Sequence, residues 1–174
     1  MGPSAWHIWT YRLTFVVLGL AIIAFSLLPL GQNTGVLVGP DLLLAFTLAW
    51  ILRQPSVVPI GVIVALFLTA DFLLQRPPGL WTALVLLVTE SLRTRRAQTT
   101  EYNFIVEWAW VTVAIFTIIV GERFVLWVLL APQSSLGLAL VYGLTTAAVY
   151  PAIVLISHYV IGLRRLGPTD AESV

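Results

Sequence analysis

The chain has 174 residues, of which 59% are hydrophobic and only 10% are charged, and its formal net charge is +1. A soluble domain usually has about 25% charged residues, so this composition predicts an integral membrane protein. The small net charge argues against nucleic acid as a partner. The absence of cysteine excludes disulfides, thiol catalysis and Cys-based metal sites.

Six apolar segments follow one another, separated by short polar or proline-containing stretches. They are 13–30, 42–52, 57–74, 80–92, 104–130 and 136–163. Helices are expected, because backbone groups in lipid must form their hydrogen bonds within the segment. The second and fourth segments have only 11 and 13 residues, whereas a spanning helix needs about 20. The sequence therefore predicts an all-α membrane protein of six transmembrane helices, with helices two and four short.

The arginines determine the expected orientation, since the chain contains no lysine. With the N-terminus in the cytoplasm, seven of the nine arginines lie on the cytoplasmic side, and only Arg76 and Arg123 lie on the other. Cytoplasmic loops are enriched in basic residues, so both termini are predicted to be cytoplasmic. All seven tryptophans fall near predicted helix ends, where indole rings favour the headgroups. We expect one transmembrane domain, 1–166, and a disordered cytoplasmic tail, 167–174.

Asp71 is the most informative charged residue, because it lies about one turn inside the end of its apolar segment. An aspartate at mid-membrane costs about 2.5–3.5 kcal/mol, and less near the interface, so a partner is expected. Arg76, across the Pro78-Gly79 corner, or Arg123 could supply an ion pair. The carboxylate could also accept N–H groups at the start of the next helix, after Gly79. Binding of a substrate or partner protein, and a proton relay, are the alternatives.

Two other positions are interpreted as structural. Asp41 follows a Gly-Pro pair and is predicted to cap the helix that begins at 42, although it could also belong to a partner site together with the corner residues. In the last segment, Pro151 follows Tyr150 and predicts a kink, because proline leaves a helical carbonyl without its usual donor. Neighbouring groups must then satisfy that carbonyl.

A basic stretch follows the fourth apolar segment and contains Arg93, Arg95 and Arg96. It is predicted to form a cytoplasmic loop that anchors the topology and contacts anionic membrane lipids. The alternative is a docking site for a cytoplasmic partner.

Few residues could perform catalysis. The two histidines, His7 and His158, have no carboxylate or second histidine at a metal-ligand spacing. The sequence also lacks a P-loop and a dinucleotide-binding fingerprint. We therefore predict no catalytic, metal or cofactor site, and expect that the protein is not an enzyme.

Three stretches resemble MreD, the small integral membrane protein family of the bacterial rod-shape system. GPDLLLAFTLAWILRQP (39–55) resembles the family's opening of helix two, and VYPAIVLISHYVIGLRRL (149–166) resembles its final helix. GVIVALFLTADFLLQRPPGLWTALVLL (61–87) resembles the family signature of a glycine, a later aspartate and then Pro-Leu-Gly, with Asp71 matching the acid and Gly79 the glycine eight residues on. The family commonly also has glycines four residues before and after the acid, where this chain has Phe67 and Gln75.

The resemblance implies a non-enzymatic adaptor of the elongasome in the bacterial inner membrane. Its implied partners are MreC, the RodA glycosyltransferase with its class B penicillin-binding transpeptidase, and the actin-like MreB at the cytoplasmic face. The implied fold is similar to the S-components of energy-coupling-factor vitamin transporters. The main alternative function is therefore an S-component-like substrate-binding module. S-components usually have an Ala-x-x-x-Ala motif in helix one, whereas Ala21 and Ala24 are three residues apart here.

Overall fold

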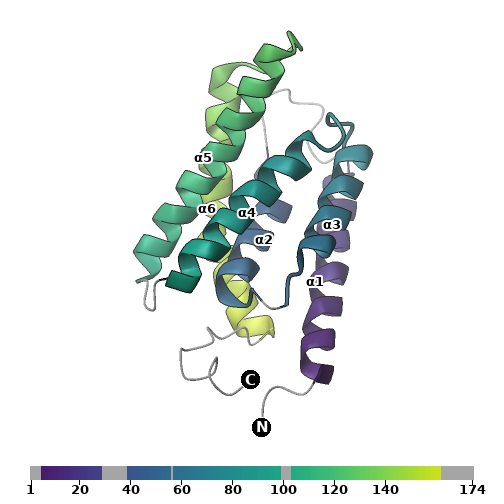
Figure 1. Ribbon diagram of the computed structural model, residues 1–174, viewed down its shortest axis with the longest axis vertical. Helices are drawn as coiled ribbons and strands as arrows, with labels where there is room; N and C mark the ends of the chain where they lie inside the picture. Colours follow the sequence, from purple (N-terminus) through teal and green to yellow (C-terminus); the bar gives the residue numbers. More distant parts are fainter. Residues whose placement is uncertain (1–4, 29–38, 56, 99–102, 162–174) are drawn as a thin grey trace.

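The computed structural model describes residues 5–28, 39–55, 57–98 and 103–161. These ranges form six α-helices (Figure 1). The helices are α1 (Ala5–Ser26), α2 (Leu42–Arg53), α3 (Ile60–Leu73), α4 (Leu80–Gln98), α5 (Phe104–Val128) and α6 (Leu136–Ile161). The prediction of an all-helical chain with six helices is confirmed for the described residues.

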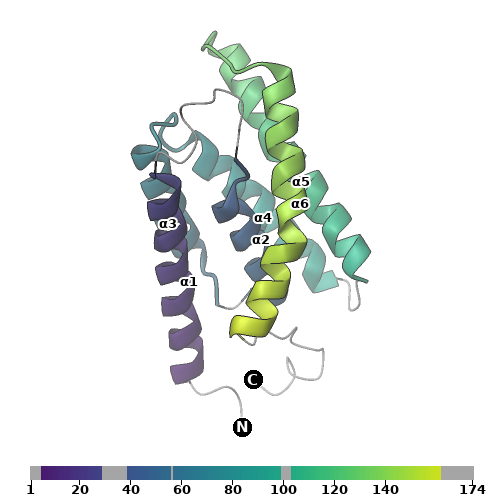
Figure 2. The same ribbon diagram turned by 180° about the vertical axis from the view of Figure 1, so that it is seen from behind.

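Helix α2 lies in the middle of the bundle and packs against α1, α4 and α6. Helices α1 and α3 lie together on one side, α5 and α6 on the other, and α4 packs against both α3 and α5 (Figures 1 and 2). Helix α1 begins and α6 ends at one end of the bundle, which we call the terminal end. The α3–α4 corner and the α5–α6 connection lie at the opposite, distal end (Figure 1).

The helix lengths differ in part from the prediction. Helices α1, α5 and α6 are each long and apolar enough to cross a membrane, and α2 is short, as predicted, with 12 residues. The prediction of a short fourth helix is wrong, because α4 has 19 residues and continues to Gln98. Its basic end is rich in good helix formers, and Glu90 and Arg93 pair one turn apart at 3.3 Å.

Helix α3 is also shorter than predicted. It has 14 residues and begins at Ile60, because Pro59 occupies the N-cap position with extended backbone angles. Proline disfavours the helical conformation in the residue before it, so the helix does not extend back to Val57. Two of the six helices, α2 and α3, are therefore too short to span a membrane alone.

The core is built around an aromatic cluster of Phe15, Phe46 and Trp50. The rings of Phe15 and Phe46 stack with centroids 5.2 Å apart, and Trp50 lies 5.4 and 5.2 Å from them. Trp50 is completely buried, as is nearly all of Trp81. Trp50 lies in the last turn of α2 and Trp81 at the start of α4, so both are near helix ends as predicted, and their rings are buried against other helices. Their position at the headgroups stays a prediction.

Candidate functional site

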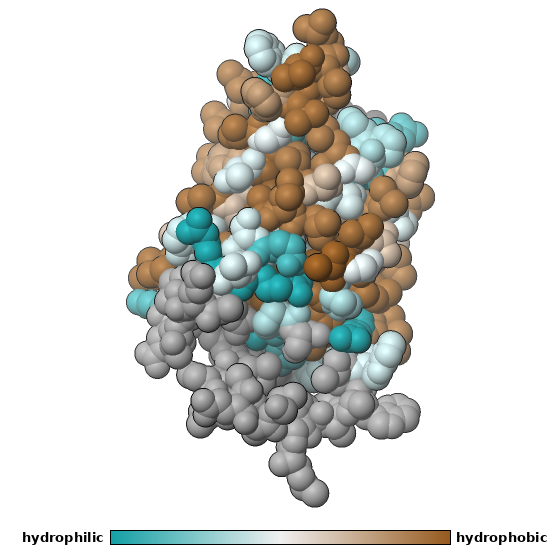
Figure 3. Space-filling view, in the orientation of Figure 1, coloured by the Kyte–Doolittle hydropathy of each residue, from teal (hydrophilic) through white to brown (hydrophobic). Residues whose placement is uncertain are grey.

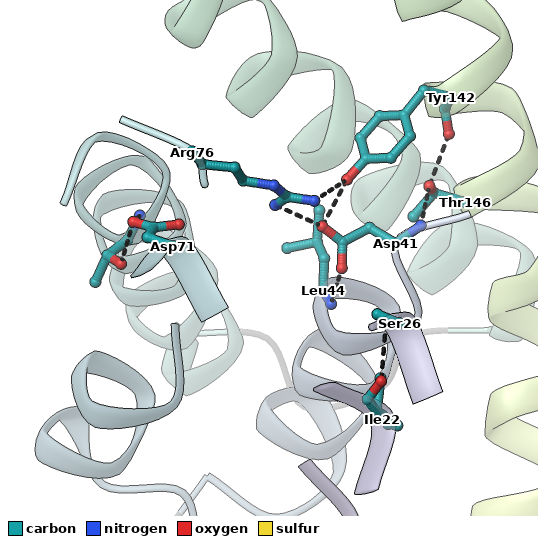
Figure 4. A network of polar contacts seen from close by, with 9 residues as sticks. Ile22, Ser26, Asp41, Leu44, Asp71, Arg76, Tyr142 and Thr146 are labelled. Atoms are coloured by element: carbon teal, nitrogen blue, oxygen red, sulfur yellow. Dashed lines mark hydrogen bonds and ion pairs between the residues drawn. The ribbon is translucent and has the colours of Figure 1, made fainter. Parts of the chain in front are cut away.

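A network of polar side chains at the distal end is centred on Asp41 (Figure 4). Its Oδ1 accepts a hydrogen bond from the backbone N–H of Leu44 at 2.9 Å, so the predicted helix cap is confirmed. Its Oδ2 accepts from the hydroxyl of Tyr142 at 2.6 Å and pairs with Nη1 of Arg76 at 3.4 Å. The backbone N–H of Asp41 donates to the hydroxyl of Thr146 at 3.0 Å. One carboxylate thus joins the start of α2 to α6 and to the α3–α4 corner.

Arg76 reaches this network from the corner between α3 and α4. Its Nη2 donates to the hydroxyl of Tyr142 at 3.3 Å, and its guanidinium lies 5.0 Å from the ring centroid of Trp81. Burial lowers the pKa of Arg76, but Tyr142 and Asp41 raise it by more, so the pKa lies above its usual value. Arg76 therefore stays charged and balances the charge of Asp41 in a part-buried site.

Asp71 forms a separate set of contacts, and its side chain is fully buried. Its Oδ2 accepts from the backbone N–H of Gly79 at 3.0 Å, from that of Thr82 at 3.3 Å, and from the Thr82 hydroxyl at 2.8 Å. The expectation that Asp71 accepts N–H groups at the start of the next helix is confirmed. The expectation of an arginine partner is wrong within the described residues, because Arg76 pairs with Asp41 instead (Figure 4).

The backbone of the corner explains this arrangement. The N–H of Leu80 donates to the carbonyl of Pro77 at 3.2 Å, and Gly79 has φ +84°. Pro78 followed by a glycine with positive φ is the pattern of a type II turn. Gln75 also has a positive φ, +55°, although only glycine adopts this region without cost. It occupies one of the two places where the resembled family has glycine.

Arg123 lies near the end of α5 and does not contact Asp71. Its Nη2 donates to the carbonyl of Ser134 at 3.0 Å, and its own carbonyl accepts from the Gln133 side chain at 3.1 Å. Arg123 therefore fastens the α5–α6 connection to α5.

A buried polar cluster near the terminal end was not predicted. The guanidinium of Arg53 lies 3.5 Å from Oε1 of Glu107, and the hydroxyl of Tyr150 donates to the same oxygen at 2.7 Å. All three residues are buried and come from α2, α5 and α6. The sequence signal for this cluster is Glu107, the single acid inside the apolar run FIVEWAW, because a buried acid in a membrane needs a partner. Arg53 is one of the seven arginines that the sequence assigns to the cytoplasmic side, and no partner was predicted for it.

Pro151 lies inside α6, and a neighbouring helix compensates for its missing N–H. The carbonyl of Ala147, four residues earlier, accepts a hydrogen bond from the indole Nε1 of Trp108 at 2.9 Å. The expectation that a neighbouring group satisfies the freed carbonyl is confirmed. Trp108 and Glu107 are adjacent on α5, so both cross-links to α6 are made by one turn of helix.

The predicted basic loop is instead the end of α4. Arg93 donates to the carbonyl of Val58 at 2.7 Å and to that of Pro55 at 3.4 Å, which ties α4 to the α2–α3 connection. The guanidinium of Arg95 lies 5.0 Å from the ring centroid of Trp110. Arg96 belongs to α4, but its side chain lies outside the described part of the structure.

The polar side chains of these sites hold neighbouring helices together. In the described ranges, no three His, Asp or Glu side chains gather as metal ligands would. The acids Asp41, Asp71 and Glu107 each accept hydrogen bonds from at least one helix other than their own. Comparisons with protein-family models, with curated protein sequences and with solved structures found no match to this chain.

Proposed function

We propose that this chain is a non-enzymatic membrane adaptor resembling MreD, which supports bacterial cell shape and lateral peptidoglycan synthesis. The observation that supports it best is that the buried charged side chains all contact other parts of the bundle. Asp41 with Arg76, Asp71 with the start of α4, and Arg53 with Glu107 all connect helices within the bundle. A bundle cross-linked at both ends is suited to hold partners in a fixed geometry.

The outward faces of the long helices supply the surface for such partners. Only 17% of the apolar window in α1, 33% of that in α5 and 28% of that in α6 is buried inside the bundle. Hydrophobic side chains cover most of the face seen in Figure 3, and hydrophilic ones gather toward the terminal end. Membrane helices associate through such faces by packing. We propose that MreC and the RodA–transpeptidase pair bind here in the inner membrane, with MreB near the terminal end.

Depletion of the protein in its rod-shaped host tests the role. We expect cells to become round, and expression of the wild-type chain to restore rods. Normal rods that acquire a requirement for an external vitamin would contradict the adaptor and favour the S-component-like alternative. Cell shape and growth on defined medium are the two measurements.

Site-specific photo-crosslinking tests the partner surface. A crosslinking residue at Val120 or Phe124, which are 63% and 62% exposed on α5, is expected to capture MreC or RodA. Ile118 on the same helix is completely buried and is the matched control, which should capture neither. Equal capture from the buried and the exposed positions, or capture of neither protein, would contradict the proposed surface.

A further inference from the structure

A pocket of about 330 Å³ lies at the distal end, between the start of α4, the end of α5 and the start of α6. Its volume is at the small end of the range of about 300–1,000 Å³ that is typical of ligand pockets. Its wall combines polar side chains, including Arg76, Glu122, Arg123 and Tyr142, with apolar ones, including Leu126 and Leu138.

Glu122 is attracted by Arg76 and Arg123 of the same wall, but it makes no direct ion pair with either. Glu122 has no hydrogen bond or ion pair within 4.0 Å in the described part of the chain, although it is half-buried in a mainly apolar helix. The neighbouring Arg123 uses Nη2 to hold the Ser134 carbonyl, and a guanidinium has five N–H donors. A half-buried carboxylate without a direct contact keeps part of its desolvation cost, which a bound cation would relieve.

Arg76 adds a second guanidinium to the same wall. Its charge is balanced by Asp41, which is not a lining residue. Lining groups of both signs therefore face a bound molecule: Glu122 as an acceptor, and Arg123 and Arg76 as donors. A ligand with only an anion would meet the Glu122 carboxylate, and one with only a cation would meet the two guanidinium groups.

We propose that this pocket binds a zwitterionic amine–anion group, whose ammonium lies against Glu122 and whose phosphate or carboxylate accepts from Arg123 and Arg76. The apolar lining favours a lipid as its source, because the lining Leu138 is itself 37% exposed and Val141, one turn further on the same face of α6, is 45% exposed. This apolar surface would carry acyl chains while the headgroup enters the pocket. A phosphoethanolamine headgroup has the required charges, and a free amino acid has the same chemistry without the chains.

Binding of defined lipids to the purified full-length protein tests the proposal. Native mass spectrometry would compare phosphatidylethanolamine, phosphatidylcholine and phosphatidylglycerol with matched acyl chains. Phosphatidylcholine has no ammonium N–H donor, and phosphatidylglycerol has no cation. Since its ammonium adds charge-assisted hydrogen bonds that the other two headgroups cannot make, we expect phosphatidylethanolamine to bind about tenfold or more tightly than either, which corresponds to about 1.4 kcal/mol.

Variants locate the site within the protein. We expect Glu122→Gln to abolish the preference over phosphatidylcholine, and Arg123→Gln to weaken all phospholipids. Glu90→Gln and Arg95→Gln, which change charges outside the pocket lining, are the matched controls. If Arg123→Gln does not fold because the α5–α6 connection is released, Arg123→Lys keeps the charge and is expected to retain a weaker preference.

A parallel titration with free glycine and with O-phosphoethanolamine distinguishes a lipid headgroup from a soluble zwitterion as the ligand. One outcome is that either soluble compound stabilises the protein against heat, that Glu122→Gln removes this effect, and that no lipid is preferred. The pocket would then bind a zwitterion, but its ligand would be a soluble molecule. Equal binding of the three lipids together with no effect of either soluble compound would overturn the proposal. So would a phosphatidylethanolamine preference that Glu122→Gln leaves unchanged. These results are independent of the adaptor role.

Discussion

The indole Nε1 of Trp108 donates a hydrogen bond to the carbonyl oxygen of Ala147, 2.9 Å away on a neighbouring helix. This carbonyl would accept the N–H of residue 151 in a regular helix, but that residue is proline. The tryptophan therefore replaces a backbone donor that α6 lacks. Sequence reasoning placed Trp108 at the headgroups for its amphipathic ring, whereas its N–H has a defined partner inside the bundle.

A double-mutant cycle tests this replacement. Trp108→Phe removes the donor and is expected to destabilise the protein by about 0.5–1.5 kcal/mol. In a Pro151→Ala background the helix supplies its own N–H, so the same substitution should cost clearly less. Unfolding in detergent followed by helical circular dichroism gives both values. Equal costs in the two backgrounds would show that Trp108 acts only through packing.

Substitution of Asp71 tests the contact between α3 and the start of α4. Asp71→Ala leaves the N–H groups of Gly79 and Thr82 without their acceptor and is expected to cost about 1–3 kcal/mol. Asp71→Asn retains an acceptor oxygen and should cost less, while both variants still insert into the membrane. Glu90→Gln, which changes a part-exposed acid, is the control. Pull-down of MreC with each variant shows whether the acid also serves a partner. Wild-type stability of both Asp71 variants would contradict a structural role at this corner.

Substitution of Gly79 tests the turn between α3 and α4, and substitution of Gly61 is its control. A Cβ atom on either would meet no other atom within 4 Å, but only Gly79 has a positive φ, +84°. Gly79→Ala should therefore cost about 1–2 kcal/mol through backbone strain alone. Gly61→Ala lies in α3 and should be neutral or stabilise by about 0.5–1 kcal/mol. Equal thermal stability of the two variants would refute the conformational argument.

Gln75 provides the converse test, because it holds φ +55° with a side chain. Gln75→Gly relieves this strain but gives the unfolded chain more freedom, so we expect a change in stability within about 1 kcal/mol. Gln75→Val is the comparison, since a β-branched residue is disfavoured at positive φ and should destabilise more. A greater loss for Gly than for Val would mean that the Gln75 side chain itself matters.

The buried cluster near the terminal end is expected to be the least tolerant of single changes. Glu107→Gln keeps an acceptor for Tyr150 but leaves the charge of Arg53 without its acid, which should cost about 3–5 kcal/mol. The double variant Arg53→Met with Glu107→Gln removes both charges and should be more stable than Glu107→Gln alone. Unfolding midpoints in detergent rank the stabilities of these variants. If the double variant loses the sum of the stabilities lost by its two single variants, the ion pair is contradicted.

Local sequence signals determined the helical class, the number of helices in the described residues and four helix starts, at Leu42, Leu80, Phe104 and Leu136. Asp41 was identified as a cap because the acceptor and its N–H donor are three residues apart, within reach of local geometry. The role of Asp71 could be predicted in part for the same reason, since Gly79 follows it by eight residues across a single turn. The boundaries of α1, α3 and α4 were less accurate. Residues outside the apolar run continue α1 and α4, whereas Pro59 makes α3 start later than its apolar run.

The pairing of charges was decided only by the tertiary structure. Arg76 follows Asp71 by five residues, yet it pairs with Asp41, which is 35 residues away, because the positive φ at Gln75 and the turn that follows lead the chain toward α2. Arg53 and Glu107 are further apart still, and their side chains meet only because α2 and α5 both pack against α4 and α6. A sequence specifies which charges need partners, since an unpaired charge in an apolar surrounding is costly. Which partner each one finds depends on how the helices pack, and that is a property of the whole fold.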